Sequence, residues 1–87
     1  MENKQLVRMR KKIDKIDEAL IFLLDERAKI VRVVGEIKIK AGLPILNKER
    51  ENHVLSKTQK FDNCEFIHLV FTKIIEESRR LQEKKWK

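Results

Sequence analysis

A chain of 87 residues is long enough for one domain, which we expect over residues 1–87, but it is near the size at which an isolated core becomes marginal. With 40% charged residues, two Gly and one Pro, the composition favours an all-helical protein, and the net charge of +7 favours an anionic partner. No apolar run approaches the roughly 20 residues of a membrane span, and the polar N-terminus shows no signal peptide. The lone Cys64 allows no intrachain disulfide and fits a reducing cytoplasm, so we expect a cytoplasmic protein. From the lack of a long apolar run we expect no membrane association.

A seven-residue apolar repeat predicts one helix from Lys4 to Ala41. With Leu6 at heptad position a, ten of the eleven a and d positions in this stretch are apolar, which is a helical and not a strand period. At about 1.5 Å per residue the helix would be a rod of roughly 57 Å. The rest of the chain is too short to cover this seam easily, so we expect a second copy to cover it. A plain coiled coil is the simpler alternative.

The exception on the seam is Arg27, whose guanidinium is costly on an apolar face unless it meets an anion. Lys38 is three turns later and differs from Arg27 by only about 20° around the helix axis. Antiparallel pairing of two copies centred near Phe22 would bring Arg10 of the second copy between these two cations. Such a cluster requires an anionic ligand. The alternative is that Arg27 pairs with a nearby carboxylate and that Lys38 lies on the surface.

Three residues mark a packing contact and the end of this helix. Gly35 costs about 1 kcal/mol relative to Ala inside a helix, which predicts a close packing contact at that position. Gly42 is expected to form a left-handed cap, and Pro44 cannot continue the helix.

Two shorter helices are expected to follow. Asn47 predicts the N-cap of a second helix over residues 48–59, and after a short link at 61–63 Asp62 or Asn63 caps a third helix that ends near residue 84. The third helix is expected to bury Phe66, Ile67, Val70, Phe71, Ile74, Ile75 and Leu81.

Ser78 and Gln82 are polar at positions where the apolar ladder of the third helix would continue. Trp86, in the charged tail, either covers a rim or is exposed. His53 and His68 lack matching Cys or carboxylate spacing, so no metal site is expected. The basic clusters lack interleaved aromatic residues, which argues against stacking on single-stranded nucleic acid but not against backbone binding.

Several short motifs occur in a fixed order along the chain. They are Met-Arg-x-x-Ile-Asp-x-Ile-Asp at 9–17, Leu-Leu-x-Glu-Arg at 23–27, Gly-x-x-Lys at 35–38, Leu-Pro-Ile at 43–45, Glu-Arg-Glu at 49–51 and Ile-Ile-Glu-Glu-Ser-x-x-Leu-Gln at 74–82. Over about residues 6–83, the set resembles the all-helical AroQ-class chorismate mutases. The resemblance implies an intertwined homodimer of three-helix chains with two shared active sites. It also implies the rearrangement of chorismate to prephenate in the shikimate-pathway route to phenylalanine and tyrosine.

That reaction is an intramolecular pericyclic step that uses no nucleophile, metal or cofactor. The protein has to hold a dicarboxylate in its compact reactive conformer and to stabilise negative charge that develops on the ether oxygen. Of the residues that the resemblance implies, Arg27, Lys38, Glu51 and Gln82 are the expected catalytic set. The implied substrate contacts are Arg10 of the second subunit, Arg27, Arg50 and Ser78 for the carboxylates, Lys38 and Gln82 for the ether oxygen, and Glu51 with the backbone of Asn47 for the ring hydroxyl.

The sequence departs from the family pattern at Asn47, where Asp is usual, at the following Lys48-Glu49 pair, and in the short link near Phe61. Three alternatives stay open at this point. Isochorismate-pyruvate lyase uses the same scaffold and similar cations, and the chain also fits a domain fused to another enzyme of the pathway. A basic helical dimer that binds nucleic acid would explain the charge but not Ser78, Gln82 or the seam position of Arg27.

Overall fold

The computed structural model describes residues 3–83, which form helices α1 (Lys4–Ala41), α2 (Lys48–Ser56) and α3 (Cys64–Glu83) and a short 3-10 helix η1 (Lys57–Lys60). No strand occurs within these residues, so the predicted all-α class with one long N-terminal helix is confirmed. The predicted end of the third helix near residue 84 and the alternatives for Trp86 lie outside the described residues.

Both ends of α1 are capped, and its predicted bounds are confirmed. The Asn3 side chain accepts hydrogen bonds from the backbone N–H groups of Gln5 and Leu6, at 2.8 and 3.2 Å. At the other end, Gly42 has a φ of 69°, the left-handed conformation that the sequence predicted. The Leu43 N–H then donates to the carbonyl of Lys38 at 2.8 Å, which satisfies an orphan carbonyl of the last turn.

The second helix begins as predicted, but it changes from an α-helix to a 3-10 helix before its expected end. The Asn47 side chain accepts a hydrogen bond from the Arg50 N–H at 3.1 Å and so caps α2. The α-helical pattern ends at Ser56, and η1 continues the spiral to Lys60. Buried Thr58 donates from its hydroxyl to the Leu55 carbonyl at 2.8 Å, which satisfies one of the carbonyls left free where the α-helix ends.

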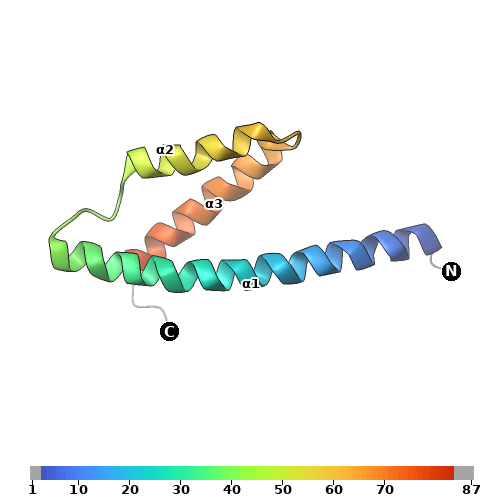
Figure 1. Cartoon of the computed structure of the whole chain (residues 1–87), viewed down its shortest axis with the longest axis horizontal. Coiled ribbons are helices and arrows are strands. Elements are labelled where there is room, and N and C mark those ends of the chain that lie inside the picture. Colours follow the sequence, from blue (N-terminus) through green and yellow to red (C-terminus); the bar gives the residue numbers. More distant parts are fainter. Residues whose placement is uncertain (1–2, 84–87) are drawn as a thin grey trace.

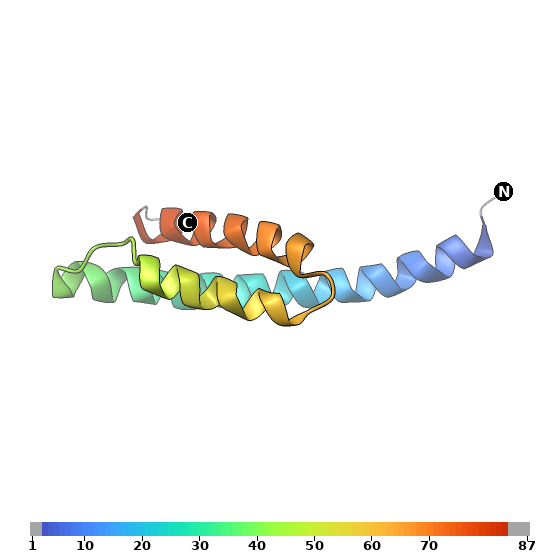
Figure 2. The ribbon, with the colours of Figure 1, turned by 90° about the horizontal axis from the view of Figure 1, so that it is seen from above.

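Helices α2 and α3 lie over only one half of α1. In both views α3 runs back along the C-terminal half of α1, whereas the N-terminal half extends beyond the other helices (Figures 1 and 2). The closest approach is at Gly35, where a Cβ atom would lie 3.0 Å from the Cα atom of Gln82. The close packing contact predicted for Gly35 is therefore confirmed, and it fixes the distance between the two helices that carry most of the site.

The intrachain core is small. Ile75 is the one buried apolar side chain larger than glycine among the described residues, at 7% exposure. Phe66 and Val70, which the sequence predicted to be buried, are 70% and 43% exposed. They precede the covered residues Ile67 and Phe71 by one position, about 100° around the helix, and so face away from α1. Within residues 3–83, no helix is long and apolar enough to cross a membrane.

Candidate active site

A pocket lies between the C-terminal half of α1, the start of α2 and the end of α3. Its walls include the connection between the first two helices as well as the helices themselves. The lining residues are Arg27, Val34, Lys38, Ile45, Asn47, Arg50, Glu51, Val54, Ile75, Ser78, Arg79 and Gln82. The structure thus brings together seven of the eight predicted substrate-binding residues, and the eighth, Arg10, does not line the pocket.

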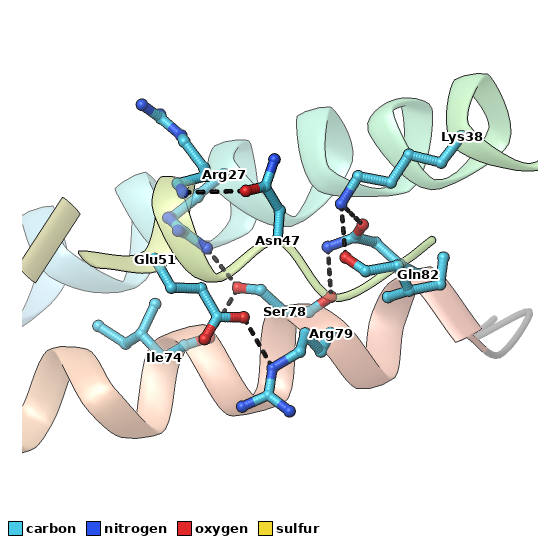
Figure 3. A network of polar contacts seen from close by, with 10 residues as sticks. Arg27, Lys38, Asn47, Glu51, Ile74, Ser78, Arg79 and Gln82 are labelled. Atoms are coloured by element: carbon cyan, nitrogen blue, oxygen red, sulfur yellow. Dashed lines mark hydrogen bonds and ion pairs between the residues drawn. The ribbon is translucent and has the colours of Figure 1, made fainter. Parts of the chain in front are cut away.

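The first polar pair in the pocket joins α1 to α3 (Figure 3). The Arg27 guanidinium donates a short hydrogen bond to the hydroxyl oxygen of Ser78. That hydroxyl donates in turn to the Ile74 carbonyl at 2.6 Å, and the Ser78 residue is 8% exposed. The Ser78 hydroxyl therefore both accepts and donates a hydrogen bond within the chain. Its oxygen fixes the direction of the half-buried Arg27 side chain.

The second polar pair, one helical turn further along α3, is formed by Lys38 and Gln82. The Lys38 ammonium donates to the Gln82 side-chain oxygen and to the Ile45 carbonyl, each at 2.7 Å. The Gln82 amide nitrogen donates to the Ser78 carbonyl at 3.3 Å, so its oxygen and nitrogen have distinct partners (Figure 3). This arrangement contradicts the alternative in which Lys38 is a surface residue, because Lys38 is half-buried and its ammonium is bonded to two other segments of the chain.

The start of α2 supplies the third wall. The Glu51 carboxylate lies 2.9 Å from Nε of Arg79 on α3, and this is an ion pair between two helices. Asn47 uses its side-chain oxygen as the cap of α2, a role that an uncharged Asn performs as well as an Asp.

The electrostatics of the pocket are dominated by positive charge. Burial lowers the pKa of the Arg27 guanidinium below its ordinary value, and the nearby charge of Arg50 lowers it further. Within residues 3–83, Arg27 forms no ion pair, and the contact of its guanidinium is a hydrogen bond to the neutral hydroxyl of Ser78. The alternative in which an internal carboxylate neutralises Arg27 is therefore wrong. Two neighbouring guanidinium groups without an internal counterion form a site for a ligand with carboxylate or phosphate groups.

Comparison with known proteins identifies the family. The family model for chorismate mutase type II matches residues 9–83. The chain belongs to the chorismate mutase type II family. A chorismate mutase from Methanocaldococcus jannaschii is 33% identical over 86 residues, covering 91% of this chain and 85% of that protein. A solved chorismate mutase structure from Thermus thermophilus has a TM-score of 0.87 and 26% identity, and the match covers 97% of this chain and 100% of that one.

Some relatives in this family are much longer. A bifunctional chorismate mutase/prephenate dehydratase from Aquifex aeolicus is 51% identical over 53 residues, which are 61% of this chain. The chain spans 15% of the length of that protein. The comparisons favour the chorismate mutase interpretation over both the lyase and the nucleic-acid alternatives.

In this chorismate mutase family member, Arg10 lies on the N-terminal half of α1. It is about 25 Å from Arg27 along the helix axis, at 1.5 Å per residue. The other seven predicted residues, six from the three helices and Asn47 from the cap before α2, meet at one pocket. Their roles toward a substrate stay predictions.

Sequence reasoning missed two contributors to this site. Arg79 reads as one more charge near the end of the third helix, but it precedes Gln82 by three residues, so the two are neighbours on the helix surface. The Ile45 carbonyl, which accepts from Lys38, has no sequence signal because it is a backbone atom in a loop.

Proposed function

We propose that this chain catalyses the rearrangement of chorismate to prephenate in this pocket, as a step toward phenylalanine and tyrosine. One observation carries the proposal. Arg27 is partly buried beside a second guanidinium, without a carboxylate partner among the described residues, and it shares its pocket with an ammonium and an amide that are held together. Family membership supports the same activity.

Arg27 and Arg50 would hold the two carboxylates of the substrate. A guanidinium fork can donate two parallel hydrogen bonds to a carboxylate, and this restricts both the position and the rotation of the bound group. Holding both carboxylates selects the compact conformer in which the reacting carbons are close. Ser78 supports this step by fixing Arg27, because its own hydroxyl proton is engaged with the Ile74 carbonyl.

Lys38 and Gln82 would stabilise the charge that develops on the ether oxygen. The Lys38 ammonium has three N–H donors, and two of them are directed to the Ile45 carbonyl and the Gln82 oxygen, so the third can face a ligand. The Gln82 oxygen is held by Lys38 and one N–H of its amide is bonded to the Ser78 carbonyl, so the second N–H is the donor that can face a ligand. Donors fixed before the reaction stabilise a developing oxyanion without reorganising. Glu51 and the backbone of Asn47 would bind the ring hydroxyl.

A homodimer with shared sites belongs to this proposal. The apolar seam of α1 is exposed along its length in a single chain, with Ile13 at 53% and Ile37 at 57% exposure. An exposed apolar stripe of this length favours association with a second copy. That copy would supply Arg10 to the pocket. A cytoplasmic location is also proposed, and it rests on the single Cys64, which fits a reducing compartment.

The direct test is to mix the purified chain with chorismate and to follow the loss of chorismate absorbance together with the appearance of prephenate. Lys38→Ala should reduce turnover by roughly 100-fold or more, because it removes a donor to the developing oxyanion. Lys40→Ala is the matched control, since Lys40 is exposed on the same helix and does not line the pocket. The absence of prephenate, or the release of pyruvate from isochorismate at a higher rate, would refute the proposal.

A further inference from the structure

The ion pair between Arg79 and Glu51 differs from the ion pairs formed by Lys29, Lys73 and Arg80 within the described residues. Those of Lys29, Lys73 and Arg80 join residues three or four positions apart on one helix, at the surface. The Arg79–Glu51 pair joins α3 to α2 at the wall of the pocket, and the Glu51 side chain is only 18% exposed. A pair that is partly withdrawn from water and that crosses between elements holds its groups in place more firmly than a surface pair within one helix.

The geometry of the pair leaves the carboxylate able to bind a ligand. The Arg79 Nε atom is buried and 2.9 Å from a Glu51 oxygen, but it forms no aligned hydrogen bond, so the contact is mainly one of charge. A carboxylate offers about four lone-pair sites, and Arg79 approaches it from the α3 side (Figure 3). Because Glu51 also lines the pocket, its remaining lone pairs can accept from a donor such as a ligand hydroxyl.

The other charges around the pocket show why the position of the Glu51 carboxylate matters. Four cationic side chains line the pocket, and Glu51 is its only carboxylate among the described residues. Without a partner of its own, Glu51 would be attracted to Arg27 or Arg50, which line the same pocket, because opposite charges attract more strongly in a partly buried site than in water. Such a contact would neutralise a cation that an anionic ligand needs.

We propose that Arg79 is a positioning residue that holds the Glu51 carboxylate on the α3 side of the pocket, where it can accept from a ligand hydroxyl and stays away from the cations that bind the ligand carboxylates. The inference rests on the proposed function for the identity of the ligand. The position of the Glu51 carboxylate itself does not depend on that function.

The kinetic test compares Arg79→Gln with Arg80→Gln, which is the same change at the next position, where the arginine pairs with Glu77 at 3.2 Å outside the pocket. Arg79→Gln should lower kcat/KM for chorismate by about tenfold, with KM rising, whereas Arg80→Gln should change it less than about twofold. Arg79→Lys, which keeps the charge, should recover part of the loss. In a Glu51→Gln background, Arg79→Gln should have almost no further effect, because the group that it positions is already absent.

Equal losses from Arg79→Gln in the wild-type and Glu51→Gln backgrounds would overturn the proposal, and so would wild-type kinetics for Arg79→Gln. A second measurement does not need turnover. Crystal structures of the ligand-free wild type and Arg79→Gln should show the Glu51 carboxylate turned toward Arg27 or Arg50 in the variant only. An unmoved carboxylate would overturn the inference even if the chain proved inactive toward chorismate, whereas inactivity with a moved carboxylate would overturn only the proposed function.

Discussion

The two halves of α1 carry the same apolar repeat but have different surroundings. The C-terminal half lies under α3 and contributes Arg27, Gly35 and Lys38 to the packing and the pocket, whereas the N-terminal half extends beyond the other helices (Figure 1). In spite of this difference, the seam is as exposed in the covered half as in the uncovered one, as Ile30 at 66% and Ile16 at 59% show. The chain packs α3 on a different face of α1.

The seam and the intrachain face meet at two residues one heptad apart. Arg27 is half-buried, and Val34 is 37% exposed and lines the same pocket, whereas the other seam residues of α1 are exposed. The seam is an apolar surface along the whole helix, and its own chain leaves it uncovered. Such a surface is suited to pack against a second copy of the chain. The position of Arg27 is therefore where a site shared by two subunits would be expected.

The largest effect is expected from Arg27→Leu. Leucine completes the apolar seam but cannot bind a carboxylate, so turnover should fall by about 10³-fold. Thermal stability without ligand should be unchanged or higher, because burial and Arg50 already disfavour the charge of Arg27.

The pH dependence of that stability gives a further check. A cation whose folded pKa is lowered below its unfolded value makes the fold less stable at every pH below the folded pKa. For Arg27 this range includes all of pH 5 to 8, so the gain in Arg27→Leu should be constant across it in thermal unfolding. A large loss of stability would contradict the picture of a strained, functional cation.

The next effect tests whether the seam is used between subunits. Ile16→Glu should separate the subunits and lower turnover by about 100-fold, because it places a charge on a face that a second copy would bury. Ile39→Glu is the matched control, since Ile39 is 67% exposed but lies opposite the seam on the same helix. Sedimentation and turnover should change for Ile16→Glu only. If both variants behave like the wild type, the seam is not a subunit interface.

A smaller and more specific effect is expected when two inactive proteins are mixed. In a dimer of Arg10→Ala and Arg27→Ala chains, one site has both arginines and the other has neither. Random exchange should therefore restore about a quarter of wild-type activity, since half of the dimers are mixed and each has one intact site. Mixed dimers that form without any recovery would show that Arg10 does not act across the interface.

Much of the fold followed from sequence periodicity, and the limits of the prediction have a physical reason. The heptads of α1, the glycine cap at Gly42 and the Asn47 cap are local signals, and the structure confirms them. The repeat, however, marked the face of α1 that its own chain leaves exposed. The face that α3 covers, at Ala28, Val31 and Gly35, has the same helical spacing, but its side chains are small, so it stands out less than the seam of large apolar residues.

The site was predicted less from periodicity than from exceptions to it. Arg27, Ser78 and Gln82 stood out because each is polar on an apolar ladder, and all three line the pocket. Arg79 did not stand out, since a charged residue on a mostly polar helix is ordinary until the partner helix is placed beside it. The burial of Phe66 and Val70 was predicted wrongly. Apolar residues occur on two faces of α3, and the sequence pattern alone does not show which of the two faces packs against the rest of the same chain.

The smallest effect concerns the contact that sets the distance between α1 and α3. At Gly35 an added methyl group would meet the Gln82 backbone at 3.0 Å, so Gly35→Ala should move α3 by a few tenths of an ångström and displace the Gln82 amide from Lys38. Overpacking should outweigh the gain in helix propensity, with a net loss of about 1 kcal/mol in the free energy of unfolding. Turnover should fall about threefold, as expected for a small misplacement of one donor.

Gly42→Ala is the matched control: its left-handed φ of 69° also makes alanine unfavourable, by about 1 kcal/mol, but nothing lies within 4 Å of an added Cβ. The two variants should lose similar stability in urea unfolding, and only Gly35→Ala should lose turnover. Equal turnover in both would mean that the Lys38–Gln82 pair tolerates the shift, and the close helix contact would then serve stability alone.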